Sequence, residues 1–492
     1  MVRASQNDGL TLVLFGGSGD LAGRMLLPAL YHLEHDRLLP DRLRIVLAGR
    51  NVAQGPASRT AVRTSLDTYI AASDFDAQSW QRFSQRIEGC VFDAADDGPA
   101  AHLASCLDQV RDDIRIFYFA TPPSLYAPIC QILRQAGLNR PCDRVVMEKP
   151  IGHDVASSRQ INGAVGEAFA ESSIFRIDHY LGKEAVQNLL ALRFANFMFE
   201  PLWHALGLRP IPLPVAESDG VGGRGGYYTT TGALRDMLQN HMLQLLCLVA
   251  MEPPVSMRAD DVRDEKVKVL RSLSPIMGTA VENLTVRGQY VPGNIGGKYV
   301  PGFAEDSGGE APATETFVAL RAGIDNWRWA GVPFFLRTGK RMPHRYTEIY
   351  IEFHPLPHSI FVGSGSDAIS PNQLIIRLQP EETIRLTMMN KVPGLDTGGF
   401  RLKELALNLN WSEAFQPMRR RIAYERLFLD LFDGNPTLFV RRDEIDAAWS
   451  WIDGIVEGWH ARAQTPLPYP AGTPGPRAAI ALPARFGHRW HG

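Results

Sequence analysis

Residues 10–33 read LTLVLFGGSGDLAGRMLLPALYHL. The first six, Leu10 to Phe15, form a short continuous apolar run that is typical of a central strand in a parallel sheet. A tight turn of small residues follows, and from Leu21 to Leu33 apolar residues recur at helical spacing. A strand, a glycine turn and a helix in this order predict an α/β domain built around a parallel sheet.

The turn itself predicts a nucleotide site. Gly17, Gly19 and Ala22 match the G-x-G-x-x-G/A pattern, in the strand–turn–helix context that the pattern requires. Small residues allow a pyrophosphate to approach the backbone N–H groups at the start of the helix. We therefore predict a Rossmann-like dinucleotide-binding domain whose cofactor contacts include Gly16, Gly17, Ser18, Gly19, Asp20 and Leu21.

The end of the second predicted strand indicates which dinucleotide binds. This strand runs from Leu43 to Ala48 and is followed by Gly49 and Arg50. NAD sites usually carry an acidic residue there for the ribose 2′-hydroxyl, whereas an arginine pairs with a 2′-phosphate. Arg50 therefore favours NADP, although an arginine at a strand end is also a common surface residue.

Two further buried strands are predicted from Arg115 to Ala120 and from Arg144 to Met147. The second strand ends in the sequence EKPIG, which includes Lys149 and Pro150. Because α/β sheets place ligand groups at the C-terminal ends of strands, Lys149 is a candidate for both cofactor and substrate binding. A solvated loop lysine is the alternative, and Pro150 is a candidate for a cis peptide bond.

Length and composition exclude several classes of protein. A chain of 492 residues favours two or three domains, and 45% hydrophobic with 21% charged residues is typical of a globular protein. The net charge of −2 gives no electrostatic case for nucleic-acid binding. The run from Met237 to Met251 is short and contains polar residues, so it predicts a buried helix and not a membrane span.

The N-terminus has no apolar signal core, and the expected location is the cytoplasm. None of the five cysteines forms a CxxC pair, which argues against a disulfide framework or a structural zinc site.

Residues 176–184, RIDHYLGKE, concentrate groups that handle protons and phosphate. Asp178 is followed by His179, and Lys183 lies four residues beyond that histidine. If a helix begins here, the spacing puts imidazole and ammonium on one face, which suits a phosphate and leaves Asp178 to orient a base. The alternative is a helix start with a capping aspartate and ordinary surface charges.

Residues 232–251, GALRDMLQNHMLQLLCLVAM, form a helical pattern with a broad apolar stripe that contains His241. A histidine on such a face is often a satisfied core residue. A partly buried neutral imidazole also suits a general base, because its reference pKa of about 6.5 lies near working pH.

Four of these segments carry a resemblance to one family. RIDHYLGKE, continued by AVQNL, resembles the substrate-site signature of glucose-6-phosphate dehydrogenases. GGSGDLAGR resembles the nucleotide loop of that family, which usually has alanine where Gly17 stands here. EKPIG resembles the family's EKPxG motif, and RDMLQNH resembles the stretch that carries its general base. The resemblance extends from about Leu12 to Pro470.

The resemblance implies roles for individual residues. His241 is the general base, and Asp178 is the carboxylate that fixes its tautomer. His179, Tyr180 and Lys183 bind the phosphate. The remaining substrate contacts that it implies are Glu217, Asp236, Lys340 and, less directly, Arg345, with Lys149 near both nicotinamide and sugar.

The implied reaction oxidises β-D-glucose 6-phosphate to 6-phospho-D-glucono-1,5-lactone with NADP, the first step of the oxidative pentose phosphate pathway. It needs no metal. The resemblance also implies a homodimer or homotetramer with the antiparallel sheet as the interface.

The chain after residue 177 differs in character from the first domain. Strands are predicted in it at Leu284–Tyr290, Thr316–Gly323, Glu348–His354 and Leu374–Leu378, and helices at Ala423–Phe432 and Asp443–Glu457. Strands followed by helices predict an α+β domain with a mostly antiparallel sheet. We therefore expect an NADP-binding domain at 1–177 and a larger domain for substrate and oligomerisation at 178–492.

Two irregular segments are predicted within this larger domain. Gly220 to Gly226 predicts a flexible connection, because it is rich in glycine and no strand leads directly into it. The proline-rich tail from Thr465 predicts an irregular surface segment.

Animal members of the family carry a second, structural NADP site lined by basic residues. Arg337 and Arg377 remain at the aligned positions, but Tyr346, Tyr350 and Thr387 stand where basic residues are expected. We therefore expect that site to be absent or much weakened.

Two other functions stay open at this point. One is a related NAD(P)-dependent dehydrogenase that acts on another phosphorylated sugar. The other is a non-catalytic NADP sensor on the same fold, although such a protein is expected to lose His241 or Asp178, and both are present.

Overall fold

The computed structural model describes residues 9–95, 98–107, 113–309, 313–361, 369–394, 401–410, 419 and 421–490. The chain forms two compact units. Unit 1 comprises Met1–Glu184, Pro254–Asp264 and Arg420–Asp446, and unit 2 comprises Ala185–Pro253, Glu265–Arg419 and Ala447–Gly492. The predicted boundary at residue 177 divides the chain by function, with the cofactor before it and the substrate after it, and this division stays a prediction.

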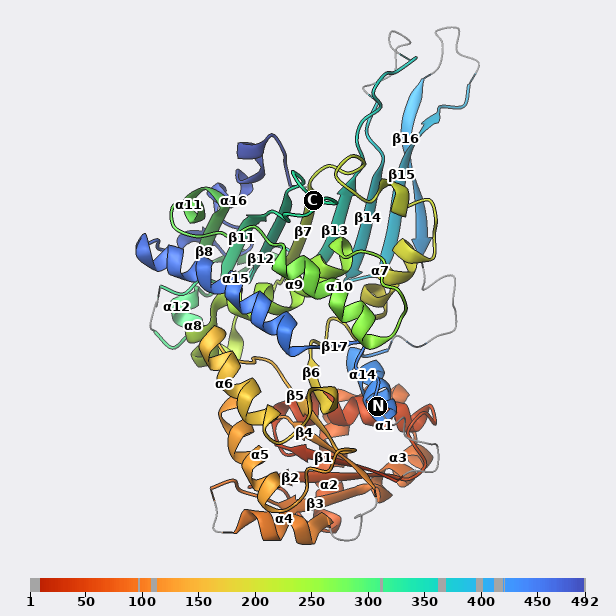
Figure 1. Ribbon diagram of the computed structural model, residues 1–492, viewed down its shortest axis with the longest axis vertical. Helices are drawn as coiled ribbons and strands as arrows, with labels where there is room; N and C mark the ends of the chain where they lie inside the picture. The colour runs from red at the N-terminus through yellow and green to blue at the C-terminus, as the bar shows by residue number, and fades with distance from the viewer. Residues whose placement is uncertain are drawn as a thin grey trace. The chain divides into compact units, whose positions relative to one another are not determined.

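Unit 1 is built on a seven-stranded sheet in the order β17-β6-β5-β4-β1-β2-β3 (Figure 1). Strands β1 to β6 run parallel, and β17 pairs antiparallel with β6. Their bounds are β1 Leu10–Phe15, β2 Leu43–Gly49, β3 Ile87–Val91, β4 Ile114–Phe119, β5 Arg144–Met147, β6 Ile174–Ile177 and β17 Phe439–Val440. Every residue of β1 and β4 is buried, which explains why both strands consist mostly of apolar residues.

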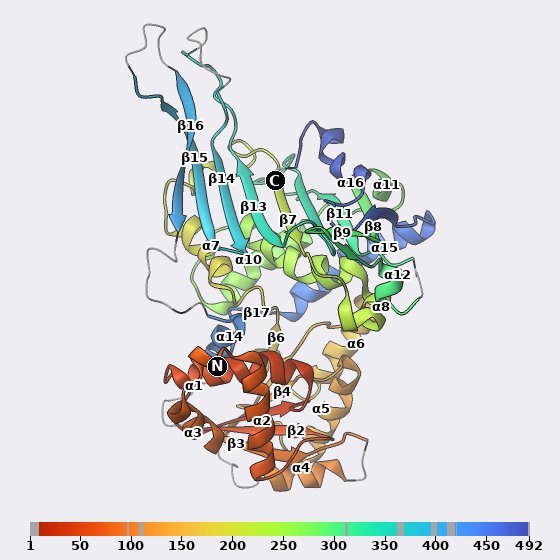
Figure 2. The same cartoon turned by 180° about the vertical axis from the view of Figure 1, so that it is seen from behind.

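Helices cover both sides of this sheet. Helix α1 packs with α2, α3 and α14, and α5 packs with α4 and α6. Figures 1 and 2 show these two groups on opposite sides of the sheet, as in doubly wound folds. The bounds are α1 Leu27–His35, α2 Pro56–Tyr69, α3 Ala77–Gln85, α4 Pro99–Leu107, α5 Tyr126–Gln135, α6 Val155–Gly166 and α14 Ala423–Asp433, with a π-helical turn η1 at Ala22–Leu26.

Unit 2 contains a nine-stranded sheet in the order β16-β15-β14-β13-β7-β12-β11-β8-β18. Pairing is antiparallel except between β7 and β12 and between β8 and β18. The bounds are β7 Ile211–Ala216, β8 Thr285–Val291, β11 Phe317–Ala322, β12 Phe334–Gly339, β13 Tyr346–Glu352, β14 Gln373–Gln379, β15 Thr383–Lys391, β16 Leu402–Asn410 and β18 Leu467–Pro470. A separate hairpin pairs β9 Gly293–Ile295 with β10 Lys298–Val300.

One face of the nine-stranded sheet is covered by helices. Burial alternates along β14, as expected for a strand with one face packed and the other open. Figure 1 shows α7, α9 and α10 in front of the sheet, and Figure 2 shows β13 to β16 from the opposite side. The helices that lie wholly or partly in this unit are α7 Glu184–Phe194, α8 Gly225–Ala233, the π-helix η8 Leu234–Met242, α9 Leu243–Ala250, α10 Ala259–Arg271, α11 Ala280–Leu284, α12 Phe303–Asp306, α15 Arg442–Ala461 and α16 Arg477–Ile480.

Short 3₁₀ turns complete the described elements. They lie at η2 Ala72–Asp74, η4 Pro123–Leu125, η5 Glu171–Ser173, η6 Glu200–Leu202, η7 Gly222–Arg224 and η9 Pro483–Phe486. Within the described part of the chain, no helix is both long and apolar enough to cross a membrane.

The predicted fold class is confirmed: a parallel, Rossmann-like sheet in the first unit and a mostly antiparallel sheet in a larger α+β unit. The prediction for the tail from Thr465 is wrong. Residues Leu467–Pro470 add β18 to the edge of the large sheet, and Tyr469 is buried. Proline is tolerated there because an edge strand does not need every N–H for pairing.

The prediction of a flexible connection at Gly220–Gly226 is also wrong. Residues 222–224 form a 3₁₀ turn, and α8 begins at Gly225. A side chain at Gly225 would meet the backbone of Asp306 at 2.8 Å, so glycine here allows close packing and does not mark a loose loop.

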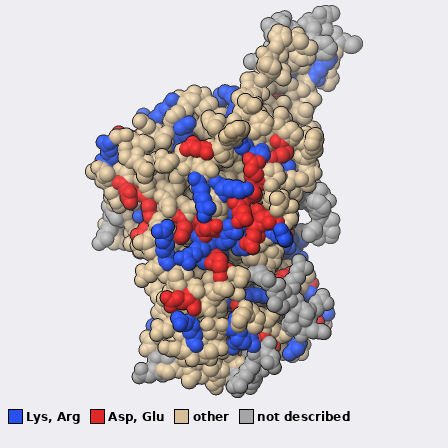
Figure 3. Space-filling view, in the orientation of Figure 1, with Lys and Arg blue, Asp and Glu red and all other residues tan. Residues whose placement is uncertain are grey.

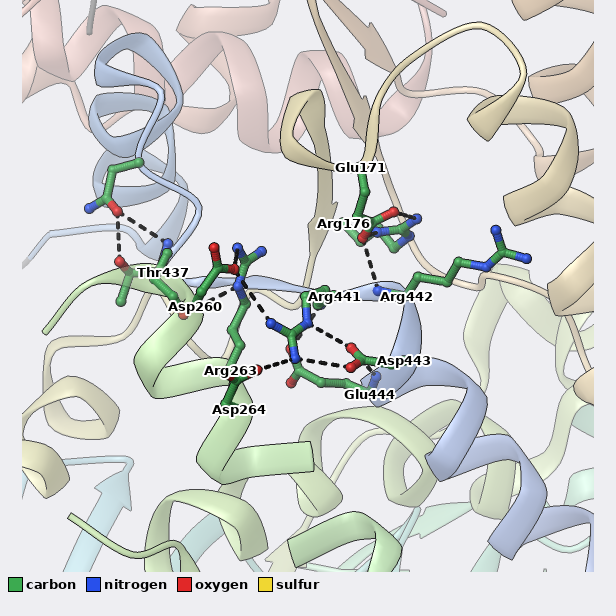
Figure 4. Close-up of polar contacts among 12 residues, drawn as sticks. Glu171, Arg176, Asp260, Arg263, Asp264, Thr437, Arg441, Arg442, Asp443 and Glu444 are labelled. Carbon is green, nitrogen blue, oxygen red and sulfur yellow. Dashed lines mark hydrogen bonds and ion pairs between the residues drawn. The ribbon is translucent and has the colours of Figure 1, made fainter. Parts of the chain in front are cut away.

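A network of charged groups joins distant segments within unit 1 (Figure 4). The Arg441 guanidinium pairs with Asp260 at 3.4 Å, Asp264 at 2.5 Å and Asp443 at 2.8 Å, and so connects the starts of α10 and α15. Just before Arg441 in the chain, β17 pairs antiparallel with β6, and β6 leads directly into Asp178.

Arg176 fixes β6 from its buried side. Its guanidinium is 1% exposed, donates to Asn162 at 2.7 Å, and forms two bonds with the Glu171 carboxylate at 2.6 and 2.9 Å. The same carboxylate accepts the backbone N–H of Arg442 at 3.0 Å (Figure 4).

Replacing Arg176 tests this network. Arg176→Met keeps most of the buried volume but removes the charge-assisted bonds, so it should lower the free energy of unfolding by about 2–3 kcal/mol. Denaturant melts of the full-length protein, followed by circular dichroism, measure the loss. Arg442→Met is the matched control, because the Arg442 side chain is exposed and only its backbone serves Glu171. Equal stability of both variants would contradict a role for the buried guanidinium.

Candidate active site

The glycine turn after β1 is held against the end of β2. Gly16 has φ +82°, and its N–H donates to the Ala48 carbonyl at 2.8 Å. The N–H of Gly17 donates to the same carbonyl at 3.1 Å. A Cβ at Gly17 would lie 2.8 Å from the Leu47 Cβ, so in this chain the turn packs too closely on β2 for alanine without a shift.

The outer side of the turn is open. Ser18, Gly19 and Asp20 are exposed, and Leu21 is partly exposed, at the first turn of the helix that continues through η1 into α1. The turn follows β1, which lies between β2 and β4 at the point where the strand order reverses. Ligands of open α/β sheets bind at that point, and free backbone N–H groups at a helix start favour an anion.

Arg50 lies beside this turn. Its side chain is 76% exposed, and its Nε is 4.0 Å from the nearest carboxylate oxygen of Asp93. A Cβ built on the preceding Gly49 would lie 3.8 Å from the Ser18 Oγ, which shows how near the two segments are. The guanidinium is therefore available to a charged group on a ligand in the turn.

Lys149 follows a buried carboxyl group. Glu148 accepts hydrogen bonds on one carboxylate oxygen from Tyr118 at 2.5 Å and from Tyr424 at 3.1 Å, and its backbone carbonyl accepts from Tyr126 at 2.9 Å. Burial raises the pKa of Glu148, and the tyrosine hydrogen bonds oppose that shift. The Lys149–Pro150 peptide bond is cis, as the sequence suggested.

The segment after β6 is a series of turns. The backbone N–H groups of Leu181, Gly182 and Lys183 donate to the carbonyls three residues earlier, and α7 begins only at Glu184. The conditional prediction of a helix that places His179 and Lys183 on one face is therefore wrong. A Cβ at Gly182 would lie 2.6 Å from the Ala423 carbonyl, so close packing on α14 accompanies the turns.

Aromatic rings organise the side chains of this segment. Asp178 is 2% exposed and accepts the N–H of Tyr180 at 3.0 Å. The Lys183 Nζ lies 3.5 Å from the centre of the Tyr180 ring, and the His179 ring is stacked on Tyr424 with 6.4 Å between centroids. Unit 1 therefore brings Asp178, His179, Tyr180 and Lys183 into one compact segment.

Sequence reasoning missed Tyr424. It was assigned only to a helix, and nothing in its local pattern marks it. Its pKa is raised by burial, then by the nearby Glu148 and Asp178 carboxyls, which places its hydroxyl near both groups. Only the packing of α14 in unit 1 reveals this position.

Unit 2 holds a second group of candidate residues. Glu217 follows β7 and Lys340 follows β12, and because these strands are parallel with Ala216 opposite Gly339, both side chains emerge at the same end. The Lys340 Nζ lies 2.6 Å from a carboxylate oxygen of Glu217. Both groups are partly exposed, so this ion pair is accessible to a ligand.

Tyr228 is a further member of this group that the sequence did not indicate. Its ring centre is 5.5 Å from the Lys340 Nζ, and the residue is 3% exposed. Burial, followed by the charges of Asp236 and Glu217, raises its pKa well above the usual value. Its hydroxyl has no hydrogen-bond partner among the described residues. An unpaired buried hydroxyl beside a lysine and two acids suits a polyhydroxylated ligand.

The helical segment η8 carries both Asp236 and His241. Gly232, with φ +70°, breaks the helix just before it, and Glu315 then accepts the N–H of Leu234 at 3.2 Å. His241 is 1% exposed, as expected from its position in the apolar stripe of the predicted helix. π-helical turns widen a helix and are frequent at functional sites.

The remaining predicted residues have other surroundings. Arg345 is exposed in the segment that leads into β13. At the positions aligned with a second NADP site, Arg337 donates to Tyr346 at 2.6 Å and Arg377 pairs with Glu348 at 2.6 Å. Both arginines are therefore engaged within the protein.

Comparison with known proteins assigns both units to one family. The model named "Glucose-6-phosphate dehydrogenase, NAD binding domain" matches residues 13–188, and "Glucose-6-phosphate dehydrogenase, C-terminal domain" matches residues 190–491. The glucose-6-phosphate 1-dehydrogenase of Zymomonas mobilis is 50% identical over 98% of this chain and 99% of its own. That of Mycolicibacterium smegmatis is 48% identical over 99% and 98%.

A solved structure of a glucose-6-phosphate dehydrogenase in complex with its substrate glucose-6-phosphate matches with a TM-score of 0.89 and 32% identity. It covers 99% of this chain and 100% of the solved one. Fold and comparisons together define an oxidoreductase with a dinucleotide-binding domain. The chain belongs to the glucose-6-phosphate dehydrogenase family.

Removing the Tyr228 hydroxyl tests its role. Tyr228→Phe should leave the melting temperature unchanged or slightly higher, because the hydroxyl has no partner in the described structure. If it bonds a sugar hydroxyl, KM for glucose 6-phosphate should rise about threefold to tenfold. Tyr290→Phe is the control, since the Tyr290 hydroxyl already donates to Asp306 at 2.8 Å. An unchanged KM in Tyr228→Phe would remove Tyr228 from the site.

Proposed function

We propose that this chain is a glucose-6-phosphate dehydrogenase that oxidises β-D-glucose 6-phosphate to 6-phospho-D-glucono-1,5-lactone with NADP. The observation that carries the proposal is membership of the family over both units, together with a buried histidine and a buried carboxyl at the positions that the resemblance assigns to catalysis. These residues are His241 and Asp178.

Each side chain has a defined task in the proposed reaction. His241 takes the proton from the C1 hydroxyl, and Asp178 is the carboxylate that orients this base. His179, Tyr180 and Lys183 hold the phosphate, which fixes the sugar far from the reacting carbon. Glu217, Asp236, Lys340 and Arg345 bind sugar hydroxyls or phosphate.

The cofactor supplies the hydride acceptor when it is bound. The exposed turn at Ser18 and Gly19 suits its pyrophosphate, and the exposed Arg50 guanidinium suits a 2′-phosphate. NADP is therefore the proposed cofactor. Asp93 near Arg50 tempers this preference, because a carboxylate competes for the same guanidinium.

A homodimer or homotetramer is part of the proposal. Leu405, Leu407 and Leu409 alternate along β16 and are 51–58% exposed, and Met388 of β15 is 43% exposed. Exposed apolar stripes on an outer strand mark interaction surfaces or aggregation hazards. A monomeric mass in solution at micromolar concentration would contradict this part.

Charge and its distribution bear on the other partners of the protein. On the face in Figure 3, acidic and basic side chains are interspersed. This arrangement, with a net charge of −2, supports a small-molecule enzyme that does not bind nucleic acid. The absence of a membrane partner and a cytoplasmic location complete the proposal.

Two narrower alternatives make different predictions. A dehydrogenase for another phosphorylated sugar would keep the phosphate-binding residues but prefer a different stereochemistry at the hydroxyls, which a substrate panel reveals. A non-catalytic NADP sensor would bind the dinucleotide without turnover on any sugar phosphate.

Substituting the proposed base tests the reaction. His241→Asn should lower kcat by about 10²–10⁴-fold while the dissociation constant for glucose 6-phosphate changes little. Absorbance of the reduced nicotinamide gives kcat, and calorimetry gives binding. His460→Asn, an exposed histidine of the same unit, is the control. Turnover little changed in His241→Asn would assign the base elsewhere.

The cofactor preference has its own test. Arg50→Ala should raise KM for NADP by about 10-fold to 100-fold, the value of a charge-assisted bond to the 2′-phosphate. KM for NAD should stay nearly constant, because NAD lacks that group. Arg59→Ala, an exposed arginine of α2, should change neither. Equal effects on both dinucleotides would show that Arg50 does not read the 2′-phosphate.

A further inference from the structure

Two cysteines of unit 1 lie together outside the candidate active site. Cys90 is in β3 and is 1% exposed, whereas Cys106 is in α4 and partly exposed. Both are free thiols, and their Sγ atoms are 2.6 Å apart. This separation is shorter than an ordinary non-bonded contact of about 3.5–4.0 Å. The fold therefore brings the two sulfurs within reach of a covalent bond.

The surroundings favour reaction at Cys106. The Nε2 of His102, one turn earlier on α4, is 3.8 Å from the Cys106 Sγ. Arg44 of β2 donates to the Cys106 carbonyl at 3.5 Å and also forms an ion pair with the Glu88 carboxylate. The His102 imidazole is placed to accept the Cys106 thiol proton, and Cys106 is partly exposed whereas Cys90 is buried. Cys106 is thus the thiol that an external reagent meets first.

Cys90 has the opposite character. Burial raises the pKa of its thiol, and the neighbouring Cys106 adds to this effect. A buried thiol with a raised pKa does not react first with a reagent in solution. Its position against the Cys106 sulfur suits it to attack a second time, after Cys106 has been modified.

We propose that Cys90 and Cys106 form a reversible dithiol–disulfide centre that reacts with low-molecular-weight disulfides. Cys106 gives its proton to His102, and the thiolate attacks the disulfide to form a mixed disulfide, releasing one small thiol. Cys90 then attacks the Cys106 sulfur and breaks the mixed disulfide, and the Cys90 proton passes to the departing thiolate, which leaves as the second small thiol; the first leaving thiolate takes its proton from His102. In sum, two protein thiols are oxidised to one disulfide and one external disulfide is reduced to two thiols.

A metal site is the competing use of the same residues. One ligand atom each of Cys90, His102 and Cys106 lies within 4.8 Å of the others. Tetrahedral zinc with Zn–S bonds of about 2.3 Å holds two sulfurs about 3.8 Å apart, which requires these sulfurs to separate. A disulfide of about 2.05 Å requires a smaller movement in the other direction. The spacing therefore favours the disulfide.

The centre lies one strand from Arg50. Cys90 pairs with Ala48 of β2, and Asp93, three residues after Cys90, faces Arg50 at 4.0 Å. A disulfide to α4 would tether the end of β3 and keep Asp93 beside Arg50. This consequence rests on the proposed function. Oxidation should raise KM for NADP severalfold and leave KM for glucose 6-phosphate unchanged.

Mass spectrometry of the full-length protein tests the bond without reference to activity. Reduced protein is treated with oxidised glutathione and measured intact and after digestion. The wild type should lose two hydrogen atoms, give a peptide that joins Cys90 to Cys106, and return to the dithiol with dithiothreitol. Cys90→Ser and Cys90→Ala should instead retain glutathione on Cys106, because the second attack is lost. Cys142→Ser, which removes another partly exposed thiol, should oxidise like the wild type.

Three results would overturn the proposal. One is wild-type protein that retains glutathione on Cys106 with no cross-linked peptide. Another is a cross-link between other cysteines. The third is stoichiometric zinc uptake by the reduced protein that blocks the oxidation and is lost in Cys106→Ser, which would assign a metal site.

If the disulfide forms with KM for NADP unchanged, the proposed effect on the cofactor site is wrong. If the protein turns over no sugar phosphate, the proposed function is wrong, but the mass-spectrometric evidence for the disulfide is unaffected.

Discussion

Burial of the Glu148 carboxyl group demands hydrogen-bond donors, and unit 1 supplies them from β4 and α14. Tyr118 and Tyr424 both donate to this group. A buried carboxyl group without hydrogen-bond donors would lower the stability of the fold. The two tyrosine hydrogen bonds therefore hold β4, the end of β5 and α14 in fixed positions. Lys149 follows directly in the chain, and His179 stacks on the Tyr424 ring. One buried acid thus helps to orient candidate contacts from segments far apart in sequence.

Two neighbouring strands in the mostly antiparallel sheet of unit 2 run parallel, and their direction matters for the candidate site. Among antiparallel neighbours, β7 and β12 run parallel, and this direction brings Glu217 and Lys340 out at the same end. Acids and a buried phenol gather there, and the Lys340 ammonium offsets their charge. The result is a polar group with spare hydrogen-bonding capacity at Tyr228, the kind of surface that a sugar phosphate can complete.

Much of the framework was predictable, because buried strands and helices place apolar residues at regular spacings along the sequence. β1 and β5 have the predicted bounds, and the helical run through His241 is buried as expected. In the large sheet, β8, β11, β13 and β14 lie close to their predicted positions. The failures have a common cause. The tail forms β18 because an edge of the sheet is available, and the segment before Lys183 turns because Gly182 packs on α14. Both outcomes depend on partners more than a hundred residues away.

By itself, the sequence determined the class of fold, the nucleotide turn, the argument for NADP from Arg50, and the family resemblance, because strand and helix periods and short motifs are local properties of a chain. Only the tertiary structure decided that Tyr424 and Tyr228 join the candidate residues, that Glu217 faces Lys340, and that Cys90 meets Cys106. Those relations depend on strand direction and on helix packing between distant segments, and no local pattern of residues encodes such distances.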